Sequence, residues 1–215
     1  MDKKSKVIII GNSPEILDYE YGSYIDSFDT VIRINHCPTA GYEKNIGSRT
    51  DIWATTHHYF HPNFWPNWAN LQQVWTRTPT VKVKVPTDFS KHKMHFMTMY
   101  KTSAWKTHKT PSGTKFIEIC KPLNHEPCTG LITILTSTLW EWDITIHGFT
   151  FYTESDGETT GYYREDELDA DGNHPEDKYW LANKKKGFSS AEEGKKKLDI
   201  IKALQSDGLI KTIDE

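Results

Sequence analysis

The sequence is poor in cysteine and has no long apolar segment. It contains no run of about 18 apolar residues, the length that a membrane-spanning helix needs. Its start, Met1-Asp2-Lys3-Lys4, is not followed by the long apolar stretch of a signal peptide. Three cysteines, an odd number, do not make a disulfide framework. From these absences we expect no signal peptide, no membrane anchor and a cytoplasmic location.

The excess of negative over positive charge is also small. The formal net charge is −3, so nothing indicates a general attraction to nucleic acid. The hydrophobic share of 36% and the aromatic share of 13% are typical of a folded protein rather than a disordered one. A chain of 215 residues suffices for one well-packed domain and is short for two. We therefore expect a single domain over residues 1–215.

The beginning of the chain predicts a strand, a tight loop and a helix. The apolar run Val7-Ile8-Ile9-Ile10 is followed at once by Gly11-Asn12-Ser13-Pro14. An apolar strand that ends in a glycine-led loop and enters a helix is how an α/β fold opens a ligand site at the carboxyl edge of its sheet. Asn12 and Ser13 add short polar side chains at the helix entry.

A second strand ends in a similar way. Thr30-Val31-Ile32-Arg33-Ile34 leads directly into Asn35. Because the carboxyl ends of parallel strands share one edge, we expect the amides of Asn12 and Asn35 on one rim. Further along, Thr129-Gly130 opens an apolar stretch, and the free N–H groups of a helix that starts there can face an anion or a ribose.

Hydrophobic periodicity and turn residues predict an α/β fold with a central, mostly parallel sheet flanked by helices. The predicted strands cover residues 6–10, 29–35, 50–54, 73–76, 81–85, 115–120 and 143–147. The predicted helices cover residues 14–19, 129–140 and 190–206, the last ended by Gly208 and followed by a short strand that begins at Leu209. Residues 36–48 are predicted to be a loop, residues 89–110 a helix-containing insertion with a basic face, and residues 152–188 a mobile polar loop or lid.

Short motifs follow one another in a fixed order over the first fifty residues. They are Gly-Asn-Ser at 11–13, Tyr21-Gly22, Asp26, Arg33-Ile34-Asn35, Pro38-Thr39, Gly41-Tyr42-Glu43 and Ile46-Gly47-Ser48-Arg49-Thr50. In order and spacing they resemble the large sialylmotif of the animal-type sialyltransferases, glycosyltransferase family 29. A lone Gly-Asn-Ser would mean little, whereas the ordered set is specific.

A second block of motifs lies in the second half of the chain. Pro127-Cys128-Thr129-Gly130-Leu131 opens it, and Asp143-Ile144-Thr145-Ile146-His147-Gly148-Phe149 closes it. The block resembles the small sialylmotif, which is Pro-Ser-Thr/Ser-Gly, a helix, and a strand that ends in Tyr-Gly-Phe. Cys128 stands where the family has serine. The two blocks together cover roughly a third of the chain.

The resemblance implies a single Rossmann-like domain of a GT-A-variant fold. It implies transfer of sialic acid or a related acidic sugar from a CMP-sugar donor to a glycan or glycoconjugate hydroxyl, with inversion at the anomeric carbon. It also implies no metal and no cofactor other than the donor substrate. By the resemblance, the residues that contact or lie beside CMP are Asn12, Ser13, Asn35, Cys128, Thr129 and Gly130. The family's His-Tyr-aromatic-Glu motif is represented either by Tyr162-Tyr163-Arg164-Glu165, which would put Tyr162 or Tyr163 by the donor phosphate, or by Tyr179-Trp180.

The general base of the family lies in a His-x4-Glu pattern before the last helix, and this chain departs from that pattern. His174 is the only histidine after position 147, and we predict it to be the base, although the fifth residue after it is Tyr179. An alternative alignment puts Glu193 at the glutamate and Phe188 at the histidine. Under that alignment the base is missing.

The family also links its two sialylmotifs by a disulfide, which this chain does not reproduce. The corresponding positions fall at Lys6 or Val7 and near Glu141. Loss of both partners together suits a reducing compartment, in line with the expected cytoplasmic location.

Several other polar residues receive a structural interpretation. Cys128 reads as a small buried thiol rather than a nucleophile, and Arg33 and Arg49 as structural ion-pair residues. The histidines at 57, 58 and 61 lack the further ligands of a metal site. The run Asp169-Ala170-Asp171 resembles the metal-holding Asp-X-Asp of other nucleotide-sugar transferases, but it follows no predicted strand and reads as a solvated acidic loop.

Three functions are compatible with these residues. The first is a sialyltransferase-like enzyme with a CMP-sugar donor, which we expect. The second is a catalytically impaired relative that binds CMP or a glycan, which the alignment without a base would favour. The third is an unrelated Rossmann-like dehydrogenase, disfavoured because Gly11-Asn12-Ser13 lacks the further glycines of a dinucleotide loop.

Overall fold

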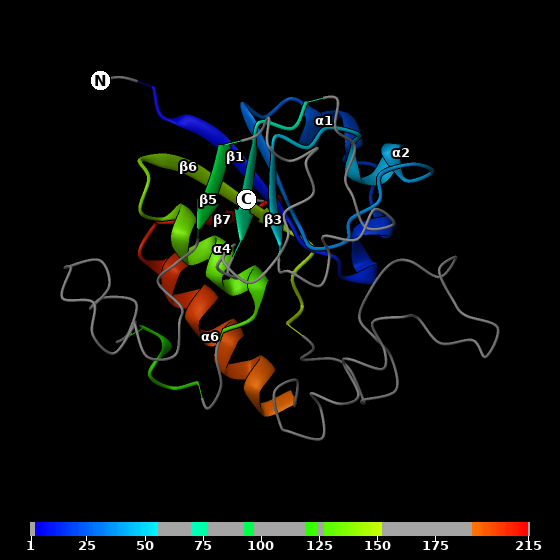
Figure 1. Cartoon of the computed structure of the whole chain (residues 1–215). Helices are drawn as coiled ribbons and strands as arrows, with labels where there is room; N and C mark the ends of the chain where they lie inside the picture. Colours follow the sequence, from blue (N-terminus) through cyan, green and yellow to red (C-terminus); the bar gives the residue numbers. More distant parts are fainter. Residues whose placement is uncertain are drawn as a thin grey trace.

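The computed structural model describes residues 3–55, 70–76, 93–96, 119–123, 127–151 and 191–214, and one β-sheet lies at its centre (Figure 1). The strands are β1 (Ser5–Ile10), β2 (Thr30–Ile34), β3 (Ile52–Thr55), β4 (Gln73–Thr76), β5 (Lys93–Phe96), β6 (Trp142–His147) and β7 (Lys211–Thr212). The helices are the 3-10 helix η1 (Pro14–Asp18), α1 (Gly22–Asp26), α2 (Glu43–Ile46), α4 (Thr129–Ser137) and α6 (Ala191–Ser206).

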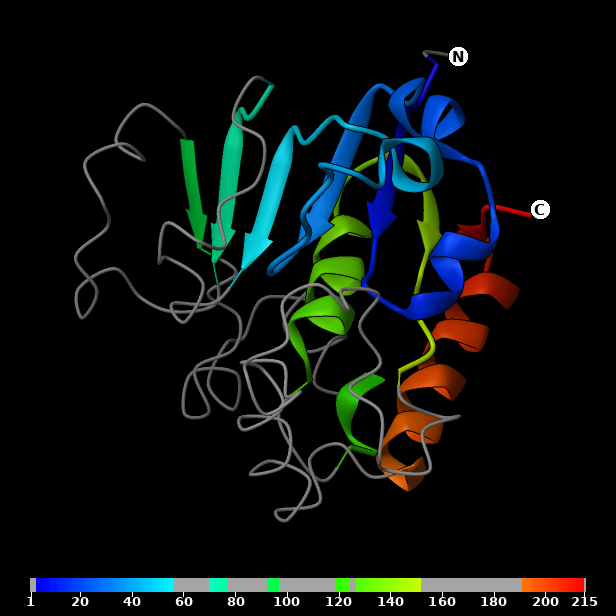
Figure 2. The same ribbon diagram turned by 90° about the vertical axis from the view of Figure 1, so that its right-hand side faces the viewer.

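The sheet has the strand order β5-β4-β3-β2-β1-β6-β7, and every neighbouring pair is parallel. Figure 2 shows the arrowheads pointing to one common edge. The chain runs outward from β1 to β5 and then returns to the other side of β1 as β6. Such a reversal opens a crevice outside the carboxyl ends of the strands beside it, where α/β proteins bind ligands.

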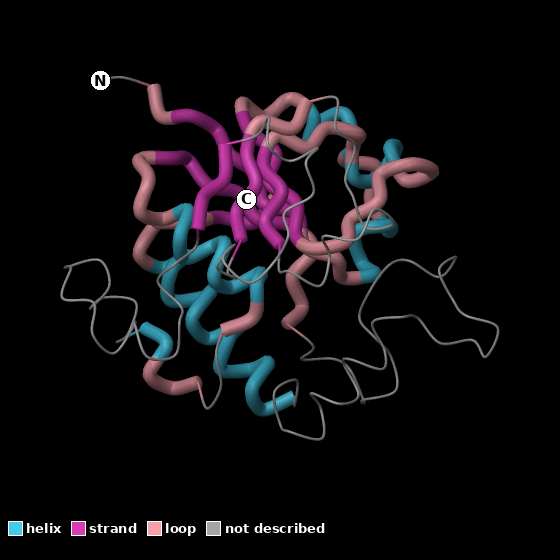
Figure 3. Tube along the Cα trace, in the orientation of Figure 1, coloured by secondary structure: helices cyan, strands magenta, loops and turns pink. Residues whose placement is uncertain are grey.

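The central strand β1 is buried on both faces, which explains its unbroken apolar sequence. Val7 and Ile9 belong to a core cluster with residues of α4 and α6. Ile8 and Ile10 point the other way and pack with residues of η1, α1 and α2. Figure 3 shows the strands as a central group with helical segments around it. The layered arrangement follows from the two-residue alternation of side chains along a strand.

Helix α4 is buried nearly all round, because it is an interior helix. Eight of its nine residues are buried. Two of its hydroxyl groups remain satisfied inside the core, since Thr133 Oγ1 donates to the carbonyl of Thr129 and Ser137 Oγ to the carbonyl of Thr133, both at 2.8 Å. This bonding lets Thr133 and Ser137 lie inside the core with their hydroxyls paired, whereas the buried hydroxyl of Thr136 has no hydrogen-bond partner among the described residues.

The predicted α/β fold is confirmed, and the details differ at several places. The predicted strands near 6–10, 29–35, 50–54, 73–76 and 143–147 are β1, β2, β3, β4 and β6 with ends shifted by up to two residues. The predicted helix 14–19 is the 3-10 helix η1, and the predicted helices 129–140 and 190–206 are α4 and α6. The last strand lies at Lys211–Thr212 rather than beginning at Leu209.

Four predictions of local structure were incomplete or wrong. The strand predicted over 115–120 is contradicted at residues 119–120, which are helical. The insertion predicted over 89–110 contains the strand β5. The predicted loop 36–48 includes the one-turn helix α2, and α1 was not predicted. Short elements of this kind carry too few residues for a periodic pattern, so their neighbours decide their conformation.

Several predicted features lie outside the described residues. These are the predicted strand 81–85, the histidines at 57, 58 and 61, the loop or lid at 152–188, and His174, Tyr162 and Tyr163 within it. The single domain over 1–215 stays a prediction.

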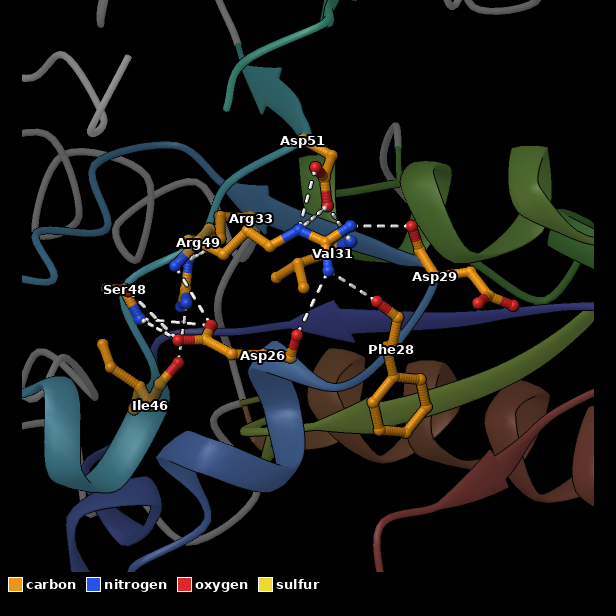
Figure 4. Close-up of polar contacts among 9 residues, drawn as sticks. All are labelled: Asp26, Phe28, Asp29, Val31, Arg33, Ile46, Ser48, Arg49 and Asp51. Carbon is orange, nitrogen blue, oxygen red and sulfur yellow. Dashed lines mark hydrogen bonds and ion pairs between the residues drawn. The ribbon is translucent and has the colours of Figure 1, made fainter. Parts of the chain in front are cut away.

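A buried polar network holds the segments around β2 together (Figure 4). Arg33 has no exposed surface and donates from Nε to the carbonyl of Arg49 at 2.9 Å, from Nη2 to the carbonyl of Ile46 at 2.6 Å and from Nη1 toward Cys37 Sγ at 3.9 Å. No carboxylate pairs with it in the part of the chain that the structure describes. Arg33 is therefore structural as predicted, but through carbonyl groups rather than an ion pair.

Arg49 completes this network, which we call the arginine network (Asp26, Arg33, Arg49 and Asp51). The Nε atom of Arg49 lies 3.0 Å from Asp51 Oδ2. The other two guanidinium nitrogens of Arg49 donate to the carbonyls of Asp26, Phe28 and Asp29. Asp26 in turn accepts from the backbone N–H groups of Ser48 and Arg49. The interpretation of Arg49 as a structural ion-pair residue is confirmed.

Candidate functional site

A pocket opens at the carboxyl edge of the sheet, where β1, β2 and β6 end beside the start of α4. We call it the α4 pocket. It is lined by Gly11, Asn12, Ser13, Ile34, Asn35, Cys128, Thr129, Gly130, Gly148, Phe149, Thr150 and Phe151. None of these described lining residues carries a formal charge. Its position at the reversal of strand order is the one expected for a ligand site in a sheet of this kind.

Three buried oxygen atoms of the α4 pocket residues have no hydrogen-bond partner among the described residues. They are Asn12 Oδ1, Ser13 Oγ and Asn35 Oδ1. Buried polar atoms are almost always hydrogen-bonded in folded proteins, because leaving one unpaired costs about 1–3 kcal/mol. Three such atoms around one pocket indicate a place for a polar ligand.

The strand ends hold the side chain of Asn12 and the backbone of Asn35 in place. Asn12 Nδ2 donates to the carbonyl of Ile34 at 3.0 Å, which identifies its other terminal atom as the unpaired acceptor. Asn35 has a positive φ of 53°, a conformation that asparagine tolerates better than most residues. Its carbonyl accepts from Trp53 Nε1 at 2.6 Å and its N–H donates to the carbonyl of Ala54 at 2.8 Å. The predicted pair of amides on one rim is thus present.

The start of α4 supplies backbone donors to the same pocket. Cys128 is the N-cap residue, and its side chain makes no capping hydrogen bond. The first intrahelical bond runs from the N–H of Ile132 to the carbonyl of Cys128 at 3.0 Å. The amides of Thr129, Gly130 and Leu131 precede it and have no acceptor within the helix. Together with the helix dipole, such amides favour an anionic or hydroxyl-rich group.

Two glycines bring the end of β1 and the end of β6 into contact. The N–H of Gly11 donates to the carbonyl of His147 at 2.8 Å, and that of Ser13 to the carbonyl of Gly148 at 3.2 Å. A Cβ on Gly11 would lie 2.0 Å from the carbonyl oxygen of Gly148. Gly148 itself has φ of +76° and faces Ile16. The loop after β1 can approach β6 so closely only because both positions lack a side chain.

A second pocket lies at the same edge, beside the ends of β6 and β7. We call it the tyrosine pocket, lined by Glu15, Tyr19, Ile146, His147, Gly148, Phe149, Thr212, Ile213 and Asp214. The rings of Tyr19 and Tyr21 stack with centroids 5.1 Å apart, and the His147 imidazole lies edge-on to both. The hydroxyl of Tyr21 donates to Asp214 Oδ1 at 2.7 Å, which raises the pKa of Tyr21.

His147 at the end of β6 is 8% exposed, and burial lowers its pKa below the ordinary value of 6.5. The nearby Asp214 carboxylate opposes that shift, but burial is the larger cause. Its Nε2 has no hydrogen-bond partner among the described residues. The imidazole is consequently neutral at neutral pH. The sequence assigned His147 no role, and only its place at a predicted strand end could have drawn attention to it.

The three cysteines are free thiols. Cys37 and Cys120 are buried and Cys128 is half-buried at the rim of the α4 pocket. Burial, with a smaller contribution from Cys128, raises the pKa of Cys120 to about 12. A thiol with such a pKa stays protonated and unreactive at neutral pH.

The predicted site residues fall into two groups. Six of them come together around the α4 pocket from three separate stretches of sequence, and these are Asn12, Ser13, Asn35, Cys128, Thr129 and Gly130. The other three, Tyr162, Tyr163 and His174, lie outside the described residues. Within the described ranges no group of three or more His, Cys, Asp or Glu side chains is placed to hold a metal ion.

Comparison with known proteins places the chain in a family. Residues 2–114, slightly more than half of the chain, match the description "Glycosyltransferase family 29 (sialyltransferase)". The chain therefore belongs to glycosyltransferase family 29, and the resemblance carried by its two sialylmotif-like blocks is confirmed.

Curated relatives agree with this assignment. The chain is 28% identical over 151 residues to the CMP-N-acetylneuraminate-beta-galactosamide-alpha-2,3-sialyltransferase 1 of Gallus gallus, a match that covers 66% of this chain and 43% of the relative. It is 46% identical over 54 residues to the enzyme of the same name from Mus musculus, covering 25% of this chain and 14% of the relative. The chain thus spans less than half the length of the curated relatives it matches.

The fold has a counterpart among solved structures. The crystal structure of a mammalian sialyltransferase in complex with Gal-beta-1-3GalNAc-ortho-nitrophenol matches with a TM-score of 0.59 and 19% identity. The match covers 98% of this chain and 69% of the mammalian one. The predicted Rossmann-like α/β architecture is therefore confirmed at the level of the fold.

The expectation of a cytoplasmic location is wrong, because sialyltransferases of family 29 are enzymes of the Golgi lumen. That expectation rested on features that the sequence lacks, namely an apolar segment and the disulfide positions of the family. The helices of the described residues include none with the length and apolar character to cross a membrane. Such absences do not determine the compartment of a chain that spans 43% of a relative.

Proposed function

We propose that the protein transfers sialic acid or a related acidic sugar from a CMP-sugar to a glycan hydroxyl, with inversion and without a metal ion. The α4 pocket is the proposed site for the CMP part of the donor. The observation that carries this proposal is the set of three unpaired buried oxygens beside an uncapped helix start. One relative is named for a beta-galactosamide and another for a beta-1,4-galactoside, so a galactose-terminated glycan is the proposed acceptor.

The chemistry of the α4 pocket fits a nucleoside monophosphate. Asn12 Oδ1 and Asn35 Oδ1 accept hydrogen bonds and would pair with ribose hydroxyls or the cytosine amino group. The amides that begin α4 donate and would pair with ribose or phosphate oxygens. Neutral donors of this kind can stabilise the leaving CMP phosphate without a divalent ion.

The size of the α4 pocket limits what it holds. Its volume is about 90 Å³, below the roughly 300–1,000 Å³ of pockets that enclose a whole ligand of drug size. It would therefore enclose one ring of the nucleotide, with the sugar beyond it. The acceptor oxygen would attack the anomeric carbon on the face opposite CMP, the bond from that carbon to the phosphate oxygen would break, and a base would take the hydroxyl proton.

Calorimetric titration with CMP tests this proposal, with UMP and NAD as matched controls and EDTA in every cell. We expect saturable binding of CMP, weaker binding of UMP and none of NAD. Transfer from CMP-sialic acid to a galactoside is then measured in the same buffer. Binding of CMP without transfer would favour the alternative that this protein is a catalytically impaired member of the family. Absence of CMP binding would contradict the proposed enzymatic function.

His174 remains the proposed general base. Replacing His174 with Ala should lower the rate of transfer by about 10²–10⁴-fold, because a positioned base contributes that much to proton transfer. The affinity for CMP should change little, since the base acts on the acceptor hydroxyl. The measurement is kcat for transfer together with the Kd for CMP. Transfer at an undiminished rate would exclude His174 as the base.

A further inference from the structure

A third pocket lies at the amino ends of β1 and β6, at the edge of the sheet opposite the α4 pocket. Four lysines line it together with Trp142, Asp143 and the turn after α6, and its volume is about 500 Å³. In Figure 2 the tails of the strands mark this edge and the arrowheads mark the other. Six strand residues span about 20 Å, so a partner bound at the amino edge leaves the α4 pocket open.

Positive charge dominates this third pocket. Four lysines (Lys3, Lys4, Lys6 and Lys211) against one aspartate give its described lining a formal charge of +3, whereas the whole chain carries −3. Lys211 Nζ pairs with Asp143 at 2.9 Å, while the other three lysines are exposed and form no ion pair within the described residues. A local charge opposite in sign to that of the whole chain orients the molecule toward a negative partner.

Two large apolar side chains are exposed beside these lysines, in the turn between α4 and β6. Leu139 is 45% exposed and Trp140 is 46% exposed. The turn is held by its backbone, because the N–H of Leu139 donates to the carbonyl of Thr136 and that of Trp140 to the carbonyl of Ser137, both at 3.1 Å. Adjacent exposed apolar residues on an ordered turn indicate a contact surface rather than a loose loop.

Trp142 joins the apolar turn to the lysines. Its ring stacks on that of Trp140, with centroids 5.3 Å apart and an interplanar angle of 14°. Trp142 also lines the lysine-rich pocket and lies opposite Ser5 in the pairing of β1 with β6, between Lys4 and Lys6 in sequence register. The indole rings and the ammonium groups therefore form one surface, which we call the amino-edge patch (Lys3, Lys4, Lys6, Leu139, Trp140 and Lys211).

We propose that the amino-edge patch docks the protein on the surface of an anionic lipid bilayer. Lysines near such a surface are attracted to its headgroups, and indole rings prefer the layer between headgroups and acyl chains. An acidic protein would pair with the lysines but would give no role to the exposed Leu139 and Trp140. In this orientation the α4 pocket faces the solution, and the docking is independent of the proposed transfer reaction.

Sedimentation with sucrose-loaded vesicles tests the docking. One set of vesicles contains phosphatidylcholine with about 30% phosphatidylserine, and the other contains phosphatidylcholine alone. We expect the whole protein to sediment with the anionic vesicles and to remain mostly in solution with the neutral ones. Raising NaCl to about 0.5 M should release most of the bound protein, because salt screens the lysines.

Variants of the amino-edge patch separate its charged part from its apolar part. Lys3→Gln/Lys4→Gln should lower the partition coefficient on anionic vesicles roughly 10–30-fold. Trp140→Ala and Leu139→Ser, made separately, should each lower it several-fold. The Tm of each variant shows whether it remains folded. The Kd for CMP should stay within twofold of wild type, because the patch lies at the edge of the sheet opposite the α4 pocket.

Two matched controls lie outside the amino-edge patch. Lys44→Gln/Lys195→Gln removes the same charge from two exposed lysines that do not line the pocket, and Tyr19→Ala removes an aromatic residue that is 44% exposed at the carboxyl edge. Both should bind anionic vesicles like wild type. Absent or equal binding to the two kinds of vesicle, or an equal loss in the lysine control, would overturn the proposal. Dependence on Lys3 and Lys4 without any dependence on Leu139 or Trp140 would overturn it in favour of an acidic protein or polymer.

Discussion

The arginine network and the α4 pocket meet at β2, where Arg33 belongs to the network and Ile34 lines the pocket, yet the two differ in whether their polar atoms are hydrogen-bonded. In the arginine network, five of the six guanidinium nitrogen atoms of Arg33 and Arg49 reach backbone carbonyls or a carboxylate. In the α4 pocket, Asn12, Ser13 and Asn35 keep buried oxygens that nothing in the described structure satisfies.

This difference separates a structural role from a binding role. A buried network whose polar groups pair with one another lowers the free energy of the fold and leaves few groups for a ligand. Unpaired buried atoms raise that free energy, and the cost is recovered when a ligand pairs with them. Residues of the arginine network should therefore affect stability and those of the α4 pocket affinity.

The largest expected effect comes from Arg33→Met. The substitution keeps an unbranched apolar stem but removes the guanidinium donors, which leaves the buried carbonyls of Arg49 and Ile46 unpaired. We expect a loss of roughly 3–5 kcal/mol in the free energy of unfolding, measured by urea denaturation. Lys44→Met, which breaks the exposed ion pair with Glu20, is the control and should cost less than about 1 kcal/mol. If the Arg33→Met protein is as stable as wild type, Arg33 does not stabilise the fold in the way described.

A smaller effect of the opposite kind is expected from Ser13→Ala. The Ser13 hydroxyl has no partner to lose within the described residues, so stability should be unchanged or slightly higher. The Kd for CMP should rise about tenfold, because one hydrogen bond to the ligand disappears. Thr136→Val is the control, since it removes another unpaired buried hydroxyl that does not line the α4 pocket. Equal effects of both substitutions on the Kd would contradict a specific contact.

Thiol reactivity gives a third and milder test. Cys128 lines the α4 pocket and is half-buried, whereas Cys37 and Cys120 are buried and the pKa of Cys120 is raised to about 12. In the native protein, iodoacetamide should therefore alkylate Cys128 first. Saturating CMP should slow that reaction several-fold, as followed by intact-mass spectrometry, and NAD should not. Alkylation of Cys128 at the same rate with and without CMP would place the nucleotide elsewhere.

The smallest effect concerns pH and the tyrosine pocket. Burial lowers the pKa of His147 below 6.5, so the unfolded chain takes up this proton more readily than the folded one. Burying the neutral His147 therefore costs no stability above pH 6.5, where the imidazole is neutral in both states. As the pH falls below 6.5, the unfolded chain gains the proton first and the folded protein loses stability. His147→Phe should reduce the fall in Tm between pH 7.5 and 5.5 by about 1–3 °C relative to wild type. The control is Tyr24→Ala, which leaves His147 in place and should show the same decrease in Tm as wild type. If the decrease in Tm for His147→Phe equals that of wild type, the effect of His147 burial is refuted.

The sequence predicted the α4 pocket much better than the rest of the edge. Asn12, Ser13, Asn35 and Thr129-Gly130 could be identified because each follows an apolar strand or begins an apolar helix. Such local patterns place residues at one edge of a parallel sheet even before the topology is known. The resemblance to the sialylmotifs pointed to the same residues.

The tyrosine pocket could not be predicted in the same way. It combines Tyr19, His147 and Asp214 from three distant stretches, and the Tyr21–Asp214 bond joins residues 193 positions apart. No local pattern marks Asp214 near the end of the chain. The partners of Arg33 were missed for a similar reason, because backbone carbonyls carry no signature in the sequence.

The sequence by itself determined the parallel α/β layering and six of the twelve described residues that line the α4 pocket, because apolar periodicity and glycine-led turns act over short distances. The family followed from the resemblance of its two motif blocks to the sialylmotifs. The sequence led to a wrong compartment where the inference rested on missing features. Only the tertiary structure decided which buried polar atoms are satisfied and which remain open, as Arg33 and Ser13 show. Hydrogen bonding is directional and depends on atoms brought together by packing, so residue type alone does not specify it.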